Sequence, residues 1–373
     1  MTIAVLGAGM VGRAIALDLA NEYKVTCFDL NAFNLEKVKT RNDTIEIVAA
    51  DLSQFTEYKT WFSPFDLVVT AVPGFMGYKT LEAVINAEKN VVDISFFPED
   101  ALALDELAKE KNITAITDCG VAPGMSNFIL GRYNEEMNVT SFECYVGGLP
   151  KVRKPPFEYK APFSPVDVIQ EYIRPARLVE NGSIVTKPAL SDREILDFEN
   201  AGKLEAFNTD GLRSLIYTMN HIPEMKEKTL RYKGHIDLII ALQQTGFFDT
   251  APIRVNDVDI TPFEFTSKLL VNEWKLGEEE QEFTVMKVIV KGEEKTVEYN
   301  LYDEYDVATK TSSMARTTGY TCTAAVNLIA KNMFTEKGVF PPELIGKDKA
   351  CFDFVINYLK ERNVNWKPLI YSL

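Results

Sequence analysis

The stretch TIAVLGAGMVG, residues 2–12, decides the fold of the first third of this chain. An apolar strand runs directly into the pattern G-x-G-x-x-G, and a helical pattern follows it. Gly7 permits the tight turn, Gly9 lets a phosphate approach the backbone, and Gly12 lets the helix pack closely on the strand. A strand, this glycine loop and a helix in that order predict a dinucleotide-binding unit.

The residues beside this loop indicate which nucleotide it holds. Met10 and Val11 open the helix, whose unpaired N–H groups and dipole favour the phosphates of a dinucleotide. Asp29 ends the next strand, where a carboxylate accepts hydrogen bonds from the ribose hydroxyls. A carboxylate at this position repels a 2′-phosphate, and no Arg or Lys follows it before Lys37. The spacing therefore favours NAD over NADP as the cofactor.

Other strand ends are candidates for the same cofactor site, because ligands of open α/β sheets bind outside the carboxyl ends of the strands. Ala71, Val72 and Pro73 follow the fourth strand, and they either contact the cofactor or form an ordinary strand-to-helix turn. Asp51 follows the third strand and either lines the adenine pocket or is a plain surface aspartate.

The first 120 residues continue to alternate β-rich runs with helical segments. Such alternation predicts a parallel, doubly wound sheet. The runs after the first are Lys24–Phe28, Ile45–Ala49, Asp66–Ala71, Val91–Ile94 and Thr114–Thr117.

From about Ser141 the pattern changes to that of an antiparallel sheet. Val285–Val290 and Thr296–Leu301 alternate in polarity and are joined by a short segment containing Gly292, which predicts a hairpin. The acidic segment Glu273–Glu282 is interpreted as an exposed loop, and the last fifty residues have a helical pattern. We therefore expect an α/β chain in three parts: a Rossmann domain (1–120), an α+β domain with a mainly antiparallel sheet (121–315), and C-terminal helices that pack back on the Rossmann domain (316–373).

Composition excludes several classes of protein. The net charge of −14, from 40 basic and 54 acidic residues, argues against a protein that tracks nucleic-acid phosphates. The five cysteines are scattered without a C-x-x-C pair and only two histidines are present, so neither a disulfide framework nor a metal site is expected. No apolar run reaches membrane-spanning length and no signal peptide is recognisable. We expect a soluble, cytoplasmic protein that binds neither nucleic acid nor membrane.

Seven further segments, in order along nearly the whole chain, resemble the saccharopine dehydrogenase-type oxidoreductases, and most of all their lysine 6-dehydrogenase branch. The resemblance implies a second domain that binds an amino-acid substrate and, usually, a homodimer. It also implies NAD-linked oxidation of lysine at its ε-carbon, which releases ammonia and leaves 2-aminoadipate 6-semialdehyde, a product that cyclises. The segments are Asp118–Met125, Tyr145–Pro150, Pro155–Tyr159, Leu204–Phe207, Thr229–His235, Met314–Thr317 and Gly338–Glu343.

Two positions favour a small amine within this family. Saccharopine reductases typically carry aspartate where Ala122 stands, and they tend to carry cysteine where Val146 stands. Ala and Val leave less polar surface for the extra carboxylates of saccharopine. Two alternatives stay open: an oxidoreductase of the saccharopine dehydrogenase type that acts on a secondary amine, and an NAD-binding sensor without turnover.

Amine oxidation needs a proton acceptor, because hydride leaves the carbon only after the ammonium has lost a proton. That proton is held with a pKa of about 10.4 in free lysine. His235 is the leading candidate, since an unperturbed imidazole titrates at about 6.5. The alternative is a structural histidine that fixes a strand end. Asp93 and Asp118 follow the fifth and sixth strands, where they either receive the cationic amine or cap the next turn.

Substrate contacts are expected from the second domain. Arg231 clamps the substrate α-carboxylate or pairs with an acid between strands. In an extended segment Arg231, Lys233 and His235 share one face, which places a positive group and a base together. Weaker candidates for substrate binding are Tyr145, Gly147, Gly148 and Thr245.

The segment around Gly120 and Pro123 is expected at the nicotinamide end of the cofactor site. Pro123 and Gly124 suit a type II turn in which glycine supplies a positive φ. A helix is expected to begin near Ser126, and its N-terminus would orient the nicotinamide or a carboxylate.

Overall fold

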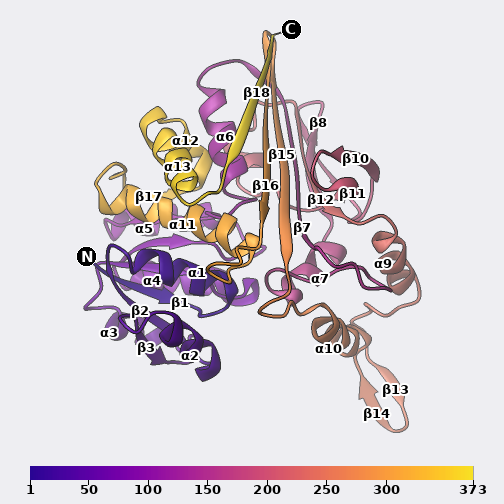
Figure 1. The fold of residues 1–373 in the computed structure, drawn as a ribbon, viewed down its shortest axis with the longest axis horizontal. Helices are drawn as coiled ribbons and strands as arrows, with labels where there is room; N and C mark the ends of the chain where they lie inside the picture. The colour runs from indigo at the N-terminus through magenta and orange to yellow at the C-terminus, as the bar shows by residue number, and fades with distance from the viewer. Residues whose placement is uncertain (373) are drawn as a thin grey trace.

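A seven-stranded parallel sheet is built around the strand that carries the glycine loop (Figure 1). The computed structural model describes residues 1–372, and it places the strands in the order β17-β6-β5-β4-β1-β2-β3. The expected doubly wound Rossmann sheet is therefore confirmed. Its strands are β1 (Thr2–Leu6), β2 (Lys24–Asp29), β3 (Glu46–Ala49), β4 (Leu67–Thr70), β5 (Asn90–Asp93), β6 (Thr114–Ile116) and β17 (Gly338–Phe340).

Helices cover both faces of this sheet because its strands are apolar on both sides. Ile3 and Val5 of β1 belong to a core cluster shared with helices on one face, and Ala4 and Leu6 belong to a cluster shared with helices on the other. The helices of the Rossmann part are α1 (Met10–Leu19), α2 (Ala32–Arg41), α3 (Tyr58–Trp61), α4 (Gly74–Asn86) and α5 (Asp105–Glu110).

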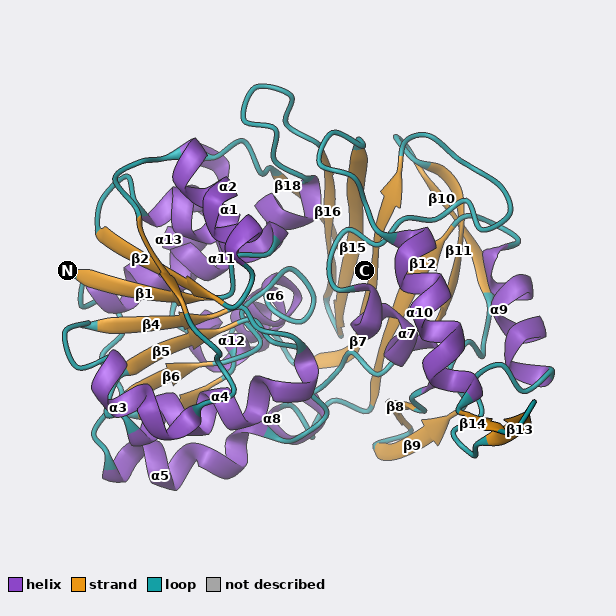
Figure 2. Ribbon diagram, turned by 90° about the horizontal axis from the view of Figure 1, so that it is seen from below, coloured by secondary structure: helices purple, strands orange, loops and turns teal. Residues whose placement is uncertain are grey.

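A second, mainly antiparallel sheet lies beside the first (Figure 2). Its main path runs β10-β11-β12-β7-β15-β16-β18, β8 pairs with β12, and β9 pairs with β8. Within residues 1–372, β12 and β7 are the only parallel pair of this sheet. The expected hairpin is confirmed, since Lys291 of β15 pairs with Thr296 of β16. The strands are β7 (Val139–Pro150), β8 (Ala176–Glu180), β9 (Ser183–Lys187), β10 (Glu194–Phe198), β11 (Gly202–Asn208), β12 (Glu224–Arg231), β15 (Glu282–Gly292), β16 (Lys295–Glu304) and β18 (Trp366–Ser372).

An aromatic core packs on this second sheet around the fully buried Trp274. Tyr172 and Tyr159 contact the same indole ring, which joins two helices to the sheet. A small hairpin, β13–β14, projects away from this core (Figure 1). The elements are α6 (Met125–Asn134), α7 (Pro165–Ile173), α8 (Leu215–Thr218), α9 (His235–Gln244), α10 (Pro262–Trp274), β13 (Ile253–Val255) and β14 (Val258–Ile260).

The C-terminal segment returns to the Rossmann part, as expected. The long helix α11 (Ser313–Ala330) packs on α1, and β17 adds to the edge of the parallel sheet. Helices α12 (Pro342–Gly346) and α13 (Lys349–Glu361) follow. The expectation that the chain ends as a helix is wrong, because Trp366–Ser372 forms β18 and pairs with β16.

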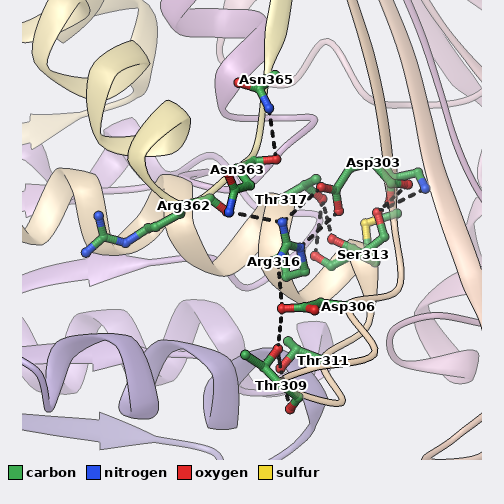
Figure 3. Close-up of polar contacts among 12 residues, drawn as sticks. Asp303, Asp306, Thr309, Thr311, Ser313, Arg316, Thr317, Arg362, Asn363 and Asn365 are labelled. Atoms are coloured by element: carbon green, nitrogen blue, oxygen red, sulfur yellow. Dashed lines mark hydrogen bonds and ion pairs between the residues drawn. The ribbon is translucent and has the colours of Figure 1, made fainter.

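Arg316 ties these returning elements to the second sheet (Figure 3). Its guanidinium pairs with Asp303 of β16 at 3.2 Å and with Asp306 at 3.3 Å. The same group donates to the Arg362 carbonyl, just beyond α13, at 3.1 Å. Because Arg316 and Asp303 are both buried, the network fixes the start of α11 against the end of β16.

The acidic segment Glu273–Glu282 is not simply an exposed loop, which corrects the sequence interpretation. Helix α10 runs to Trp274, and Glu282 is fully buried at the start of β15, where its carboxylate accepts from the Ser313 backbone N–H. Glu278 lies 2.8 Å from Arg13 and forms an ion pair with the Rossmann part. Cations and backbone donors of other elements compensate these charges, and a linear pattern cannot reveal such partners.

No helix within residues 1–372 is long and apolar enough to cross a membrane. In the same range no three His, Cys, Asp or Glu side chains group as metal ligands. All five cysteines are free and buried.

Candidate active site

The glycine loop between β1 and α1 has the geometry that a dinucleotide requires. Gly7 has a φ of +102°, and a Cβ there would lie 2.3 Å from the Ala71 carbonyl oxygen. A Cβ on Gly12 would lie 2.0 Å from the Gly7 carbonyl oxygen, so helix and strand approach as closely as glycine permits. A Cβ on Gly9 would meet nothing within 4 Å, so the space over the loop is open to a phosphate.

The N-terminus of α1 offers unpaired donors to that space. Its N-cap, Gly9, provides no side-chain hydrogen bond, and its first turn carries no acidic residue. Arg13 N donates to Gly9 O at 2.9 Å, which leaves the N–H groups of Met10 and Val11 without helical partners. These residues fit a dinucleotide pyrophosphate, and their contact with it remains a prediction.

Asp29, the last residue of β2, is turned toward the glycine loop. Its Oδ2 accepts from Ala8 N at 2.6 Å, and its Oδ1 accepts from Asn31 N at 2.7 Å. The carboxylate therefore fixes the loop at the strand end where a dinucleotide ribose lies. The next basic residue along the chain, Lys37, is already engaged, with its Nζ 2.6 Å from Glu278 Oε1.

The turn Ala71–Pro73 lies against this loop. Ala71 N donates to Leu6 O at 2.8 Å, and Pro73 is the N-cap of α4. Val72 is buried behind the turn. Asp51 lies in the turn after β3, where hydrogen bonds from the hydroxyl and the N–H of Ser53 lower the pKa of its carboxyl. Cofactor contacts by these residues remain predictions.

Asp93 and Asp118 both lie at the carboxyl edge of the parallel sheet, and each already has partners. Asp93 is fully buried, accepts from the Thr70 hydroxyl and from Ser95 N, and burial raises the pKa of its carboxyl to about 7. Asp118 pairs with Arg213 at 2.8 Å, and both side chains are 4% exposed. Arg213 comes from the segment before α8, so this ion pair links the Rossmann domain to the domain that contains the second sheet.

The segment from Gly120 to the start of α6 forms a closed turn. Gly120 N donates to Pro123 O at 3.1 Å, and Gly124 has a φ of +139°, as expected for this glycine. Helix α6 begins at Met125, within one residue of the expected start. The Asn127 side chain accepts from Gly124 N at 3.2 Å and caps the helix. A role of Gly120 and Pro123 in cofactor binding remains a prediction.

His235 does not lie in an extended segment, which corrects the expected geometry. Strand β12 ends at Arg231, and His235 is the first residue of α9, so the stripe through Lys233 does not exist. The imidazole is 3% exposed and bonds the Tyr172 hydroxyl and the Phe157 carbonyl oxygen, both at 2.9 Å. Burial, followed by the charge of Arg231, lowers the pKa of His235 to about 3. This pKa lies well below the value of about 6.5 at which an unperturbed imidazole titrates, and a catalytic role of His235 remains a prediction.

Arg231 is held in the same aromatic core. Its Nε donates to the Tyr172 hydroxyl at 2.8 Å, and its guanidinium pairs with Glu171 of α7 at 3.3 Å. The guanidinium also lies 4.3 Å from the centre of the Tyr159 ring. These contacts occupy the cation, and its role as a carboxylate clamp remains a prediction.

The remaining substrate candidates lie in β7 and after α9. The Tyr145 hydroxyl donates to Glu143 at 2.7 Å. Gly147 and Gly148 are required by packing, since a Cβ on either would lie less than 3 Å from Leu230 or Pro162. The Thr245 hydroxyl donates back to the Ala241 carbonyl at the exposed end of α9. Substrate binding by these four residues remains a prediction.

Sequence reasoning missed several charged residues that gather between the two sheets. These four residues come from three separate segments: Glu227 from β12, Glu171 and Arg174 from the end of α7, and Arg213 from the segment before α8. A signal for Glu227 was present, because Glu227, Thr229 and Arg231 alternate along one strand and so share a face. The others carry no periodic signal, since they are brought together only by the fold.

Comparison with known proteins agrees with this architecture. The sequence profile described as "Saccharopine dehydrogenase NADP binding domain" matches residues 3–116, and "Saccharopine dehydrogenase C-terminal domain" matches residues 120–364. The structure described as "Apo histidine-tagged saccharopine dehydrogenase (L-Glu forming) from Saccharomyces cerevisiae" superposes with a TM-score of 0.79, over 99% of both chains at 18% identity. At that identity the likeness shows the fold alone.

The matches to curated relatives cover only part of this chain and only part of each relative. "Alpha-aminoadipic semialdehyde synthase" of Arabidopsis thaliana is 25% identical over 226 residues, which cover 57% of this chain and 21% of the relative. "Saccharopine dehydrogenase (NADP(+), L-glutamate-forming)" of Pyricularia oryzae is 22% identical over 268 residues, which cover 66% of this chain and 58% of the relative. The chain therefore spans between about a fifth and three fifths of the relatives it matches.

Two profiles that together span nearly all of residues 3–364 decide the assignment. The family expected from the ordered motifs is confirmed, whereas the lysine 6-dehydrogenase branch is not. The protein belongs to the saccharopine dehydrogenase family, and its Rossmann domain is the family's pyridine-nucleotide-binding domain.

Proposed function

We propose that this protein is an NAD-dependent lysine 6-dehydrogenase, which oxidises the ε-carbon of L-lysine and releases ammonia. The observation that carries the proposal is a glycine loop that fits a dinucleotide, together with apolar residues at positions 122 and 146. Ala122, which follows β6, and Val146 of β7 are partly buried and pack against the extended hydrophobic cluster that also includes Ile3 and Val5 of β1. Apolar side chains at these positions suit the short methylene chain of lysine and offer no hydrogen bonds to additional carboxylates.

The residues of this chain supply binding and orientation for the reaction. The N–H groups at the start of α1 hold the pyrophosphate, and Asp29 accepts from the ribose hydroxyls. A bound nicotinamide supplies the acceptor for one hydride. The buried Glu227 carboxyl, which lies between the sheets, is the group that we propose to contact the substrate.

The preference for NAD over NADP rests on charge at the ribose. The Asp29 carboxylate repels a 2′-phosphate, and the Lys37 ammonium is held 2.6 Å from Glu278. The matched profile and the Pyricularia oryzae relative are named for NADP. A preference for NAD would therefore distinguish this chain from them. We further propose a homodimer, as the resemblance implies, which light scattering of the purified protein would test.

A second function is favoured by the comparisons. The matched structure and several relatives are named saccharopine dehydrogenases, which would make saccharopine the substrate and NADP the cofactor. A third possibility, a nucleotide-binding sensor, would bind cofactor without turnover.

One substrate screen separates these functions. Purified protein is mixed with NAD or NADP and with lysine, ornithine or saccharopine at alkaline pH, and NADH or NADPH formation is followed by absorbance. The proposed function predicts turnover of lysine with NAD. Turnover of saccharopine alone favours the second function, and cofactor binding without any turnover favours the sensor.

A further inference from the structure

Most charged side chains between the two sheets are already paired. Asp118 pairs with Arg213 at 2.8 Å, Asp210 with Arg177 at 2.8 Å, and Glu171 with Arg231 at 3.3 Å. Each of these three carboxylates therefore has its own guanidinium. Two further charged groups of the same region, one carboxyl and one guanidinium on different elements, have neither a side-chain hydrogen bond nor an ion pair within the described residues.

The unmatched carboxyl is Glu227. It is 6% exposed, and within residues 1–372 only burial and more distant charges, with no hydrogen bond, act on its carboxyl. A Cβ on Gly211 would lie 1.7 Å from its Oε1, so glycine at that position leaves the room that the carboxyl occupies. A buried carboxyl without a partner is costly, and such groups are kept where a ligand completes them.

The unmatched guanidinium is Arg174, the C-cap of α7. Its Nη1 is buried without a hydrogen-bond partner, and no carboxylate in the described part of the chain lies within ion-pair distance. The guanidinium lies 5.5 Å from the centre of the Phe96 ring, and Arg213 lies 5.1 Å from the same ring. Arg174 thus stands free beside the segment that follows β5.

Helix α7 brings Arg174 to the cofactor edge of the parallel sheet. A Cβ on Gly74, directly after the turn Ala71–Pro73, would lie 2.2 Å from Phe96 O and 3.1 Å from Asp167 Oδ1 of α7. The turn, Phe96 and α7 therefore meet at one place. Arg174 and Arg213 lie against the same Phe96 ring, and the Glu227 carboxyl lies against Gly211, two residues before Arg213, so the two unmatched groups lie in one region.

We propose that Arg174 and Glu227 are the two ends of an amino-acid site: Arg174 binds the substrate carboxylate, and Glu227 receives the ammonium whose carbon is oxidised and takes its proton. An α-amino acid with a terminal ammonium supplies the two charges that this site lacks. The inference rests on the proposed function and deepens it by naming the groups that recognise the substrate.

The step balances as follows. The Glu227 carboxylate takes one proton from the ε-ammonium and becomes a carboxylic acid. The ε-carbon then loses one hydrogen with its electron pair to NAD⁺, which becomes NADH, while the nitrogen lone pair forms the C=N bond of an iminium. Water adds to that carbon, ammonium leaves, and the aldehyde remains. Lysine is oxidised by two electrons, NAD⁺ is reduced by two, and one proton is released to solvent.

The surroundings of Glu227 suit a proton acceptor that works in alkaline solution. Burial raises the pKa of its carboxyl to about 8, and nearby charges modify this value. Its ionised form therefore increases as the pH rises through about 8. The charged groups that act on it are Glu171 of α7, Asp210 and Arg213 of the segment before α8, and Asp118 after β6.

The first experiment compares lysine with cadaverine, which lacks only the carboxylate. Arg174→Met should raise KM for lysine by roughly 10- to 100-fold with kcat nearly kept, and it should leave cadaverine kinetics unchanged. Arg254→Met, an exposed arginine of the projecting hairpin, is the control. Equal effects on both amines, or no effect, overturn the role of Arg174.

The second experiment tests Glu227. Glu227→Gln should lower kcat by about 10²–10⁴-fold and remove the ionisation near pH 8 from kcat/KM. The matched control is Glu282→Gln, since Glu282 is also buried with a carboxyl pKa raised by burial to about 8. Near-normal kcat with the same pH profile in Glu227→Gln overturns the role.

A third variant guards against misfolding. Gly211→Ala displaces the Glu227 carboxyl without removing it, so its loss of kcat should not add to that of Glu227→Gln in the double variant. Additive losses contradict the proposal.

The proposed function and this inference can fail separately. If the unmutated protein oxidises saccharopine but not lysine, the proposed function fails, and the same variants assayed with saccharopine decide the inference. A protein that neither oxidises nor binds any of these amino acids contradicts both.

Discussion

Asp29 Oδ2 accepts a hydrogen bond from Ala8 N at 2.6 Å, which links the end of β2 to the glycine loop. The carboxylate that would recognise the ribose therefore also shapes the loop that would hold the pyrophosphate. Loop shape and cofactor choice depend on one side chain, so a single substitution affects both.

Asp29→Ala should weaken NAD binding and narrow the preference for NAD over NADP. A charge-assisted ribose contact contributes on the order of 1–3 kcal/mol, which corresponds to about 5- to 150-fold in Kd. Calorimetric titration with NADH and NADPH measures both affinities. Equal affinity of the unmutated protein for the two cofactors would remove the argument from Asp29.

His235 should govern acid stability rather than the pH dependence of turnover. The pKa of the folded state is lowered to about 3 from an ordinary value near 6.5, so the unfolded chain binds the extra proton. The free energy of unfolding should therefore fall as the pH drops below about 6.5, by at most about 1.4 kcal/mol per unit from this group.

Urea denaturation of His235→Gln between pH 7 and pH 4 checks this expectation. The slope of unfolding free energy against pH should be smaller than in the unmutated protein. His221→Gln is the control, since His221 is exposed and its imidazole bonds the Asn134 side chain. An unchanged slope in His235→Gln would show that the imidazole is not buried in its neutral form.

The buried pair Asp118–Arg213 should contribute strongly to the joining of the two domains. Arg213→Met leaves the Asp118 carboxylate buried without a cation, which costs about 3–5 kcal/mol. The double variant Asp118→Asn with Arg213→Met should regain part of this loss in urea denaturation. The exposed pair Arg254–Asp259 is the comparison, because removing it should cost about 1 kcal/mol or less. Similar losses at the two pairs would contradict the buried geometry.

Local pattern was sufficient for much of the fold. The run from Thr2 to Gly12 predicts the first strand, turn and helix because glycine requirements and alternation act over a few residues. The hairpin of β15 and β16 follows from two alternating runs and a short turn. Strand β18 could not be predicted in the same way, since Trp366–Ser372 contains Pro368 and gains its strand form from pairing with β16.

The candidate site was predicted unevenly for the same reason. The glycine loop and Asp29 were predicted correctly, because each lies within or directly beside a regular strand or helix. His235 was misplaced because Gly234, with a φ of +98°, turns the chain from β12 into α9. Arg174 and Glu227 were missed because they stand out only by having no charged or hydrogen-bonded partner. Which charges are unpaired can be seen only in the folded structure.

The most direct test of the account is the stoichiometry of lysine oxidation. The unmutated protein is incubated with lysine and NAD⁺ at alkaline pH without any keto acid, and NADH and ammonia are measured in the same sample. The account predicts that both form in a one-to-one ratio, because each hydride transferred yields one iminium that water hydrolyses. The absence of ammonia, together with saccharopine formation from lysine, 2-oxoglutarate and a reduced nicotinamide cofactor, would contradict it.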